Sequence, residues 1–324
     1  MNLFKSLEAS ARRKIKTIIY PESYDKRIID AVKFILKKKI AQVILIDKNY
    51  KLDKTFAPDK NLTILDLKFS DQFVGEYHSI KLKRDPSRSL IKSKKEISDP
   101  LVFSCMLLKK DFADGIIAGS VYPTSDVLRN SISVLGLEKN CKSVSSFFLF
   151  TFPSKSIHNN KVLAFADCGV IPSPDAEQLS DIAVQTALNF KKLTGLKPRV
   201  AFLSYSTKGS AKDASFEKIF KAVTLSKKKM PSLICEGELQ FDAAFVPNVA
   251  SRKNPNGIIK GDANIFIFPD LNSGNIAYKI TERIGMASAT GPILQGLSKK
   301  VMDLSRGCSV EDIINMTTVI SNLI

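Results

Sequence analysis

The sequence predicts an α/β fold in which mostly parallel sheets are covered by helices. Short β-branched runs alternate with longer segments whose apolar residues recur about every 3.6 positions, the period of a helix. The short runs are continuously apolar, as expected of strands that are buried on both faces. Length adds a third observation, because 324 residues are long for a single core and favour two domains.

The alternation sets the order of the predicted elements. It predicts strands over residues 16–20, 41–47, 114–119, 162–167, 199–206 and 263–270, and helices over residues 27–39, 124–136, 176–190, 216–229 and 273–285. The segment 299–320 continues the same pattern towards the C-terminus. Strands separated in this way by helices are typical of a parallel sheet.

Two segments depart from this alternation. Residues 1–16 are basic and faintly similar to a transit peptide, but they carry Glu8 and lack an apolar core region, so an ordinary first helix is predicted. Between residues 50 and 98 the pattern weakens, and the basic stretch Lys81–Lys95 has no apolar period. We predict a mobile surface segment there.

The composition excludes several classes of protein. With 44% apolar and 25% charged residues, the chain is typical of folded globular proteins rather than disordered ones. Its five cysteines are odd in number and form no CxxC pair, which favours a reducing cytosol over a secreted disulfide framework. Only His78 and His158 are available as histidines, so a structural zinc site and a Ser-His-Asp triad are both disfavoured. Apolar stretches such as Ser145–Phe152 are far shorter than the roughly 20 residues of a membrane-spanning helix, so no membrane partner is expected.

The charge is strongly basic, with 49 Lys+Arg against 32 Asp+Glu and a net charge of +17. Such a surplus needs an anionic partner or a compositional explanation. Nucleic acid is disfavoured as the partner, because the lysines are scattered without interleaved aromatic residues and the chain has no Trp. A nicotinamide cofactor is disfavoured too, since no GxGxxG motif with a downstream acid follows the first strand.

The segment DLSRGCSVED, Asp303–Asp312, is predicted to turn from a strand ending at Ser305 into a helix beginning near Ser309. Such turns lie at the carboxyl ends of parallel strands, where open α/β sheets bind ligands. Ser309 and Asp312 have the spacing of a capping box, which requires no function. Arg306 beside Ser305 would instead form a donor-rich anion pocket. The spacing leaves both interpretations open.

A second hydroxyl-rich turn, LSYSTKGSAKD at Leu203–Asp213, follows another predicted strand. Its candidate anion-binding residues are Ser206, Thr207, Lys208, Gly209 and Ser210. The two-glycine spacing of a P-loop is absent, so nucleotide hydrolysis is not supported. A generic anion-binding turn and a plain hydroxyl-rich loop remain as alternatives.

Two arginines lie on predicted helices near strand exits. Thr124 or Ser125 is a natural N-cap, and Arg129 lies one turn further into the helix that follows. Arg283 lies late in the helix predicted over residues 273–285. Taken alone, each has the features of an ordinary solvated side chain.

Six segments of the chain occur in a characteristic order. They are VLAFADCGVIPSPDAEQLSDIA, LSYSTKGSAKD, EGELQFDAAF, ANIFIFPDLNSGNIAYKITERIG, GPILQGL and DLSRGCSVEDI. In this order and spacing they closely resemble the phosphate acetyltransferases (phosphotransacetylases). The match runs from about Asp99 to the C-terminus, and before that it is weaker but colinear. The resemblance implies reversible acyl transfer, in which acetyl-CoA and phosphate give acetyl phosphate and CoA.

The resemblance also implies an architecture. Family members are similar in fold to the isocitrate and isopropylmalate dehydrogenases, with a cleft between two α/β domains. The first domain would be discontinuous, residues 1–143 plus 298–324, and the second would comprise residues 144–297. A cytoplasmic homodimer with a functional link to acetate kinase is implied, with CoA as a substrate and neither a metal nor a nicotinamide cofactor. The basic surplus would then attract polyanionic CoA and phosphate.

The resemblance assigns roles by motif position. Asp312 would be the base that takes the proton of the CoA thiol. Ser305 and Arg306 would hold the acyl phosphate and the developing oxyanion. Arg129 and Arg283 match arginines that are associated with substrate or CoA binding.

Two further assignments concern substrate binding. The loop Ser206–Ser210 lies in one of the matching motifs and is expected to contact substrate. The family usually has an Arg-Lys pair upstream of the Asp-Pro that stands here at Asp99, whereas this chain has Lys83-Arg84-Asp85. Arg84 is the candidate for that role, with Lys83 as the alternative.

Physical chemistry constrains the implied mechanism. A thiol has a pKa near 8.5 and a carboxylate one near 4, a mismatch of roughly 4 to 5 units. The dipole of a helix N-terminus would stabilise the Asp312 anion, so we expect proton removal concerted with direct attack in a ternary complex. An acetyl-cysteine at Cys308 is disfavoured, because no histidine lies near it in sequence. Phosphate butyryltransferase, or a related short-chain acyltransferase, is the alternative function, because a methylene or two changes binding by only about 1–3 kcal/mol.

Overall fold

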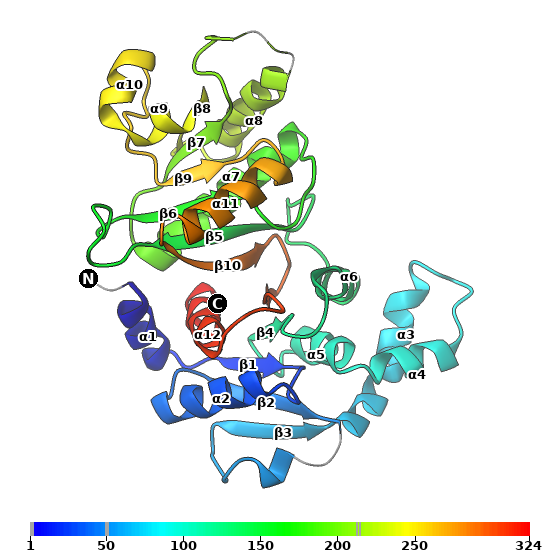
Figure 1. Ribbon diagram of the computed structural model, residues 1–324. Helices are drawn as coiled ribbons and strands as arrows, with labels where there is room; N and C mark the ends of the chain where they lie inside the picture. Colours follow the sequence, from blue (N-terminus) through cyan, green and yellow to red (C-terminus); the bar gives the residue numbers. More distant parts are fainter. Residues whose placement is uncertain (1–2, 49–51, 212, 214) are drawn as a thin grey trace. The chain divides into compact units, whose positions relative to one another are not determined.

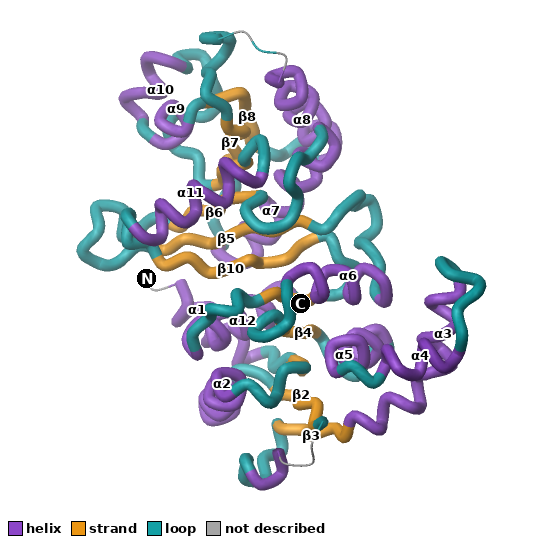
Figure 2. Tube along the Cα trace, turned by 45° about the vertical axis from the view of Figure 1, so that its right-hand side comes forward, coloured by secondary structure: helices purple, strands orange, loops and turns teal. Residues whose placement is uncertain are grey.

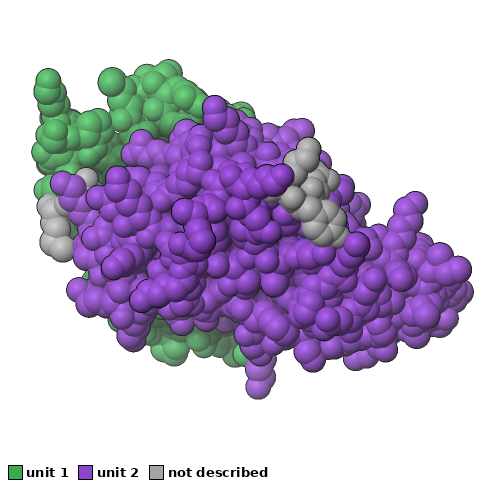
Figure 3. Space-filling view, turned by 90° about the horizontal axis from the view of Figure 1, so that it is seen from below, with its two compact units in different colours: residues 1, 140–296 green, residues 2–139, 297–324 purple. Residues whose placement is uncertain are grey.

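The structure is a computed structural model that describes residues 3–48, 52–211, 213 and 215–324. The chain falls into two compact units (Figure 3). Unit 1 comprises residues 140–296, and unit 2 comprises the chain up to residue 139 together with residues 297–324. Unit 2 is therefore built from two separate stretches of sequence.

Unit 2 contains a parallel sheet, whose described strands have the order β11-β4-β1-β2-β3 (Figure 1). The strands are β11 (Lys300–Asp303), β4 (Gly115–Ala118), β1 (Thr17–Tyr20), β2 (Gln42–Asp47) and β3 (Leu62–Asp66). Ile18 and Ile19 of β1 and Ile116 and Ile117 of β4 are fully buried. Strands this apolar on both faces are typical of a parallel sheet covered by helices, and the structure confirms that prediction.

Helices and 3-10 segments connect these strands. They are α1 (Leu3–Arg13), α2 (Lys26–Lys38), η1 (Leu52–Lys54), η2 (Leu67–Phe73), α3 (Val74–Leu82), α4 (Leu90–Ile97), α5 (Pro100–Lys109), α6 (Thr124–Val134) and α12 (Val310–Leu323). Helix α12 packs against α1 and α2 (Figure 1), which brings the two stretches of unit 2 together. Helix α2 begins where the Asp25 side chain accepts a hydrogen bond from the backbone N–H of Arg27.

The segment predicted to be mobile surface differs in the structure. Helix α4 covers residues Leu90–Ile97, and Ser89 caps it by accepting a hydrogen bond from the Lys92 backbone N–H at 3.2 Å. Only Ser93 and Ile97 of this helix are buried. The apolar residues Leu90 and Ile91 are exposed, whereas the polar Ser93 is buried. The apolar residues of this helix therefore do not mark its buried face, which explains why the sequence pattern missed it.

Unit 1 contains a mixed sheet, whose described strands have the order β10-β5-β6-β9-β7-β8. They are β10 (Ser288–Gln295), β5 (Ser145–Thr151), β6 (Val162–Ala166), β9 (Ile265–Ile267), β7 (Arg199–Leu203) and β8 (Ile234–Leu239). Strand β5 runs antiparallel to β10 and β6, whereas β6, β9, β7 and β8 are parallel. The prediction of mostly parallel sheets is thus confirmed for both units.

The helices of unit 1 are α7 (Ala176–Thr194), α8 (Ser215–Lys229), α9 (Phe241–Phe245), α10 (Pro247–Lys253) and α11 (Leu271–Arg283). Helix and strand segments alternate along most of this unit (Figure 2). Helix α7 starts with a capping box formed by Asp175 and Gln178, and it ends at Gly195, whose φ is 70°. The core contains a phenylalanine cluster that includes Phe150, Phe165 and Phe266.

Within the described residues, no helix is both long and apolar enough to cross a membrane.

Candidate active site

The loops that follow β1, β4 and β11 lie at the carboxyl ends of three neighbouring strands of unit 2. Glu22, in the loop after β1, is fully buried. Its carboxylate accepts hydrogen bonds from the backbone N–H groups of Ser120, Val121 and Tyr122 at 2.9, 2.7 and 2.6 Å, and from Ser120 Oγ at 2.8 Å. A buried carboxylate with four donors is well compensated, so Glu22 fixes the loop after β4 to the loop after β1.

The loop from β11 to α12 carries the first candidate residues. Strand β11 ends at Asp303 rather than at Ser305, so the sequence prediction of the strand end was wrong by two residues. Asp303 is the last residue paired with β4, opposite Ala118, and the chain then leaves the ladder. Ser305 and Arg306 consequently lie in a turn, and both are exposed.

Asp312 forms the predicted capping box with Ser309. Its Oδ2 accepts hydrogen bonds from the backbone N–H and the hydroxyl of Ser309, both at 2.8 Å, and its own N–H donates to Ser309 Oγ at 3.1 Å. The Asp312 side chain is exposed, and among the described residues its Oδ1 has no hydrogen-bond partner. Oδ2 thus caps the helix, whereas Oδ1 faces solvent.

Asp303 is buried directly before this turn. Its Oδ2 accepts a hydrogen bond from Thr124 Oγ1 at 2.6 Å, whereas Oδ1 has no partner among the described residues. Burial raises the pKa of this carboxyl to about 7, with a further contribution from the charge of Glu22. Gly119 has a φ of 104°, and a Cβ there would collide with Asp303 Oδ1.

The contact with Asp303 also corrects a sequence prediction. Thr124 or Ser125 was expected to cap the following helix, but α6 begins at Thr124 and its N-cap residue is Pro123, without a side-chain cap. The Thr124 hydroxyl is instead directed to Asp303, a residue far away in sequence. The Thr124 hydroxyl therefore donates to the buried Asp303 and does not provide the helix cap that the local pattern predicted.

Cys308 lies in the same turn but is buried. Burial raises the pKa of its thiol to about 11, although the positive charge of Arg27 acts in the opposite direction. A thiol with this pKa is almost entirely protonated near neutral pH, and the thiolate is the nucleophilic form. The environment of Cys308 therefore opposes a role as an acyl-accepting nucleophile.

The other candidate residues of unit 2 lie along α6. Arg129 is largely exposed and pairs with Asp126, one turn earlier on the helix. Arg84 donates from Nη2 to the carbonyl of Ile132 at 3.5 Å. The structure thus brings Arg84 to the same helix that carries Arg129. Lys83 is exposed in the same loop.

The candidate loop of unit 1, Ser206–Ser210, is tied to a buried carboxylate. Glu238, at 0% exposure, accepts hydrogen bonds at Oε1 from Ser206 Oγ at 2.9 Å and from the Gly209 N–H at 2.8 Å. Lys208 pairs with Glu236 at 2.9 Å, and Thr207 Oγ1 accepts a hydrogen bond from a backbone N–H. Ser206 and Thr207 are buried, so their hydroxyls are used inside the unit. Residue 212 of this motif lies outside the described residues.

Arg283 belongs to unit 1 as well. It is the last residue of α11, its side chain is 80% exposed, and its Nε lies 3.7 Å from a carboxylate oxygen of Glu282. An ion pair of this length at the surface contributes little stability. The guanidinium therefore remains accessible.

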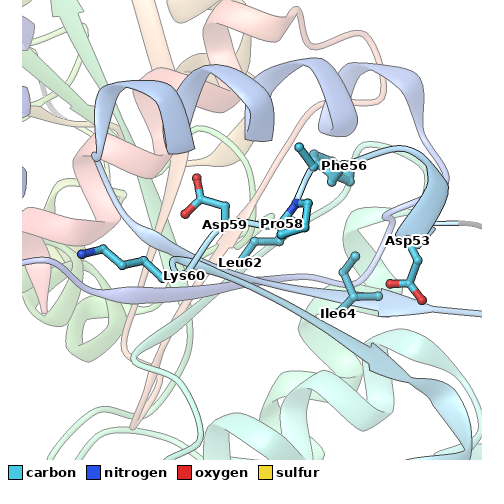
Figure 4. Close-up of a pocket in the computed structure, with 8 residues that line it drawn as sticks. Asp53, Phe56, Pro58, Asp59, Lys60, Leu62 and Ile64 are labelled. Carbon is cyan, nitrogen blue, oxygen red and sulfur yellow. The ribbon is translucent and has the colours of Figure 1, made fainter.

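A cavity of about 610 Å³ lies elsewhere in unit 2, around β3 (Figure 4). Phe56, Pro58, Leu62 and Ile64 line it together with charged side chains such as Lys60. Strand β3 and strand β11 are at opposite ends of the described sheet order. This cavity is therefore separate from the turn that carries Ser305 and Arg306.

In the described part of the chain, no group of three or more His, Cys, Asp or Glu side chains is arranged to hold a metal ion.

Comparison with known proteins agrees with the arrangement of these motifs. The family model described as phosphate acetyl/butaryl transferase matches residues 2–321. The chain belongs to this family. It is accordingly an acyltransferase. The phosphate acetyltransferase of Acetivibrio thermocellus is 42% identical over 323 residues, covering 98% of this chain and 97% of the relative. The phosphate acetyltransferase of Bacillus subtilis is 38% identical and covers 98% of both chains.

Solved structures of family members share the fold. A phosphotransacetylase from Streptococcus pyogenes superposes with a TM-score of 0.91 at 34% identity, covering 99% of this chain and 97% of the other. A phosphotransacetylase from Staphylococcus aureus gives 0.88 at 31% identity, covering 99% and 98%. A putative 4-hydroxythreonine-4-phosphate dehydrogenase from Salmonella typhimurium, at 10% identity and a TM-score of 0.55, shares the fold alone. The predicted isocitrate dehydrogenase-like fold is confirmed.

Two residues of the candidate site were not found from the sequence. Glu22 and Arg27 both follow β1, and both contact the loops after β4 or β11. Their partners lie some 90 to 280 residues away along the chain. The available signal was their position at the carboxyl end of a predicted parallel strand, where ligand sites form.

Proposed function

We propose that this family member transfers an acetyl group between CoA and phosphate, converting acetyl-CoA and phosphate reversibly into acetyl phosphate and CoA. The relatives named phosphate acetyltransferase support the acetyl group as the unit transferred. The observation that carries the proposal is the exposed turn at the N-terminus of α12. It presents a hydroxyl, a guanidinium and a carboxylate within eight residues, Ser305–Asp312.

Asp312 is the proposed base for the CoA thiol. Its Oδ2 is held by Ser309 at 2.8 Å, which fixes the carboxylate while Oδ1 faces solvent. An ordinary carboxylate is a much weaker base than the thiolate of a thiol with a pKa near 8.5. The proton therefore moves to Asp312 as sulfur attacks the carbonyl carbon of acetyl phosphate, and a free thiolate need not form.

Ser305 and Arg306 are proposed to bind the acyl phosphate. The planar guanidinium of Arg306 can donate two hydrogen bonds to phosphate oxygens, or stabilise the oxyanion of the tetrahedral intermediate. The Ser305 hydroxyl is an additional donor, and Ser305 Oγ also accepts a hydrogen bond from the Gly307 N–H at 3.2 Å. Collapse of the intermediate then releases phosphate, and CoA carries the acetyl group.

The acetyl group is proposed to pass directly between the two substrates in a ternary complex. The raised pKa of Cys308 supports this route, because an acetyl-cysteine intermediate would need a reactive thiolate. Holding both substrates together lets positioning supply much of the rate.

The remaining arginines are proposed to bind substrate. Arg84 and Arg129 are exposed at one helix, α6, and would present positive charge to the phosphates of CoA. Arg283 is the corresponding exposed guanidinium of unit 1. In the loop Ser206–Ser210, the exposed residues are Lys208, Gly209 and Ser210, and the hydroxyl of Ser210 is engaged by Ser206 and Thr207. Lys208 and Gly209 are therefore the proposed substrate contacts.

Several broader features are part of the proposal and follow from the family resemblance. We propose domain limits at residues 1–143 plus 298–324 and at 144–297, a homodimer, a cytoplasmic location, and a functional link to acetate kinase. Neither a metal nor a nicotinamide is required for the transfer. Sedimentation at several protein concentrations tests the dimer, and a concentration-independent monomer would contradict it.

Release of free thiol from acetyl-, propionyl- and butyryl-CoA, measured with and without phosphate, tests the function. We expect phosphate-dependent release with the highest kcat/KM for acetyl-CoA. A higher value for butyryl-CoA would favour the alternative, a phosphate butyryltransferase or related short-chain acyltransferase, which a difference of about 1–3 kcal/mol can separate. No phosphate-dependent release from any of the three would contradict the proposed reaction.

A further inference from the structure

Arg27 makes an unusually complete set of hydrogen bonds. It lies in the first turn of α2, and its side chain is partly exposed. Nη1 donates to the carbonyl oxygens of Arg306 and Cys308 at 2.7 and 3.0 Å. Nη2 donates to the carbonyl of Ser120 at 2.8 Å and to Asp25 Oδ2 at 2.6 Å, and Nε donates to the Asp25 carboxylate at 3.1 and 3.2 Å. A guanidinium has five N–H donors, and these contacts use all of them.

These contacts join three loops of unit 2. Asp25 belongs to the loop between β1 and α2, Ser120 to the loop between β4 and α6, and residues 306 and 308 to the loop between β11 and α12. The three strands are neighbours in the sheet. A single planar group therefore holds the turn Ser305–Ser309 against the rest of the sheet edge.

The acceptors show what kind of role Arg27 has. Since all its donors are bound to protein, no N–H remains to bind a phosphate or a thioester. Two of the acceptors are main-chain carbonyls of the turn that carries Ser305 and Arg306. Fixing these carbonyls fixes the backbone from which the Arg306 side chain extends.

Asp25 completes the arrangement. Burial would raise the pKa of its carboxyl, but hydrogen bonds from Arg27 outweigh burial and lower it overall. The ion pair is thus intact near neutral pH. The same carboxylate caps α2 through the Arg27 N–H at 2.8 Å, which fixes where the Arg27 side chain begins.

We propose that Arg27 is a positioning residue for acyl transfer, which holds the turn Ser305–Ser309 in its reactive geometry without touching substrate. This inference rests on the proposed function of that turn. A lysine at position 27 retains the charge, but its single nitrogen cannot reach acceptors in three loops with a planar fork. The contribution of Arg27 is therefore geometric.

Steady-state kinetics of Arg27→Lys test the role. We expect kcat to fall by about 10- to 100-fold, since small displacements of reacting groups cost rate, while KM for CoA and for acetyl phosphate changes less than about threefold. Arg12→Lys is the matched control, because Arg12 is an exposed arginine of the same unit that pairs with Glu8, and it should behave as the unsubstituted protein. Asp25→Asn retains an N-cap residue and should give a smaller fall in kcat than Arg27→Lys.

A second readout does not depend on catalysis. Cys308 is buried in the turn, and its Sγ lies 3.8 Å from Arg27 Nη1. Loosening the turn should expose this thiol, so Arg27→Lys should react with a disulfide reagent at least about tenfold faster at one cysteine. The double variant Arg27→Lys/Cys308→Ala should lose that reactive thiol, which assigns it to Cys308 rather than to the other four cysteines.

The outcomes separate the two proposals. An unchanged kcat, or unchanged thiol reactivity in a folded Arg27→Lys variant, would overturn the positioning role. A rise in KM with unchanged kcat would mean that Arg27 binds substrate, which also overturns it. If the unsubstituted protein transferred no acyl group to phosphate but the thiol readout changed as expected, the proposed function would fail while Arg27 would still hold the turn.

Discussion

Two loops of this protein have similar sequences but are held in place by opposite charges. The turn Ser305–Ser309 in unit 2 and the loop Ser206–Ser210 in unit 1 each contain two serines, one basic residue and one glycine, and each follows a parallel strand. In unit 1 the loop is bound to the buried carboxylate of Glu238. In unit 2 the turn is held through its carbonyls by Arg27, and its serine and arginine side chains face solvent. The charge of the neighbouring side chain therefore decides which groups hold the loop: a carboxylate accepts from its hydroxyl and N–H, whereas a guanidinium donates to its carbonyls.

The largest expected effect is at Asp312, in the first turn of the helix that follows Ser305–Ser309. Asp312→Asn should lower kcat by about 10²- to 10⁴-fold, the range typical of a lost general base, and should raise KM much less. Asparagine also accepts the hydrogen bonds of a helix N-terminus, so the free energy of unfolding should change by less than about 1 kcal/mol. Kinetics and denaturant unfolding of the variant measure both. An unchanged kcat would leave Asp312 with its capping role alone.

A change at the loop Ser206–Ser210 should alter the stability of the protein rather than its catalytic rate. Glu238→Ala leaves Ser206 Oγ and the Gly209 N–H without their buried acceptor, which should cost about 1–3 kcal/mol of unfolding free energy. Because the hydroxyls of this loop are hydrogen-bonded within unit 1, kcat should fall by less than about tenfold. Glu238→Gln keeps an acceptor and is the matched control. A loss of kcat comparable to that of Asp312→Asn would abolish the distinction between the loops.

A pH dependence of stability is expected at Asp303, the last residue of β11 before the turn Ser305–Ser309. The pKa of Asp303 is raised to about 7, so the fold favours its neutral form. The resulting stabilisation is fully present below pH of about 4 and is lost as pH rises through about 7. Relative to the unsubstituted protein, Asp303→Asn should therefore gain roughly 2 kcal/mol between pH 5 and pH 8. Urea unfolding of both proteins at the two pH values measures this difference, and an equal response would show that Asp303 is ionised throughout.

The smallest effect is expected at the buried thiol of the same turn. Cys308→Ala should leave kcat within about threefold, because a thiol with a pKa of about 11 is not the acyl acceptor. Rapid-quench experiments with labelled acetyl phosphate measure covalent acetyl-enzyme in parallel. Complete loss of activity in the variant, together with acetyl-enzyme trapped in the unsubstituted protein, would restore the two-step route.

Local patterns of the sequence predicted much of the fold and part of the candidate site. The alternation of apolar runs and helical periods predicted β1, β2, β4, β6, β7 and β9, but it did not predict β3, β5, β8 or β10. The spacing of Ser309 and Asp312 correctly predicted the capping box. These features depend on residues that are neighbours along the chain. The family resemblance then indicated which of these ordinary local motifs belong to a reaction site.

The features that were missed depend on distant partners. Nothing near Ser206 in sequence indicates that Glu238 accepts its hydrogen bond, and nothing near Thr124 indicates that Asp303 does. Helix α4 was missed because its apolar residues Leu90 and Ile91 are exposed while Ser93 is buried. Nothing near Arg27 in sequence indicates that its guanidinium donates to the carbonyls of Arg306 and Cys308.

The discontinuity of unit 2 has a consequence for biosynthesis. Strand β11 pairs with β4, and α12 packs on α2, yet the whole of unit 1 is translated between the two stretches. On the ribosome, unit 1 can fold as soon as it emerges, whereas β4 must wait about 180 codons for its neighbour. The nascent chain therefore exposes an incomplete sheet edge during elongation, and a chain released early would lack both Arg306 and Asp312.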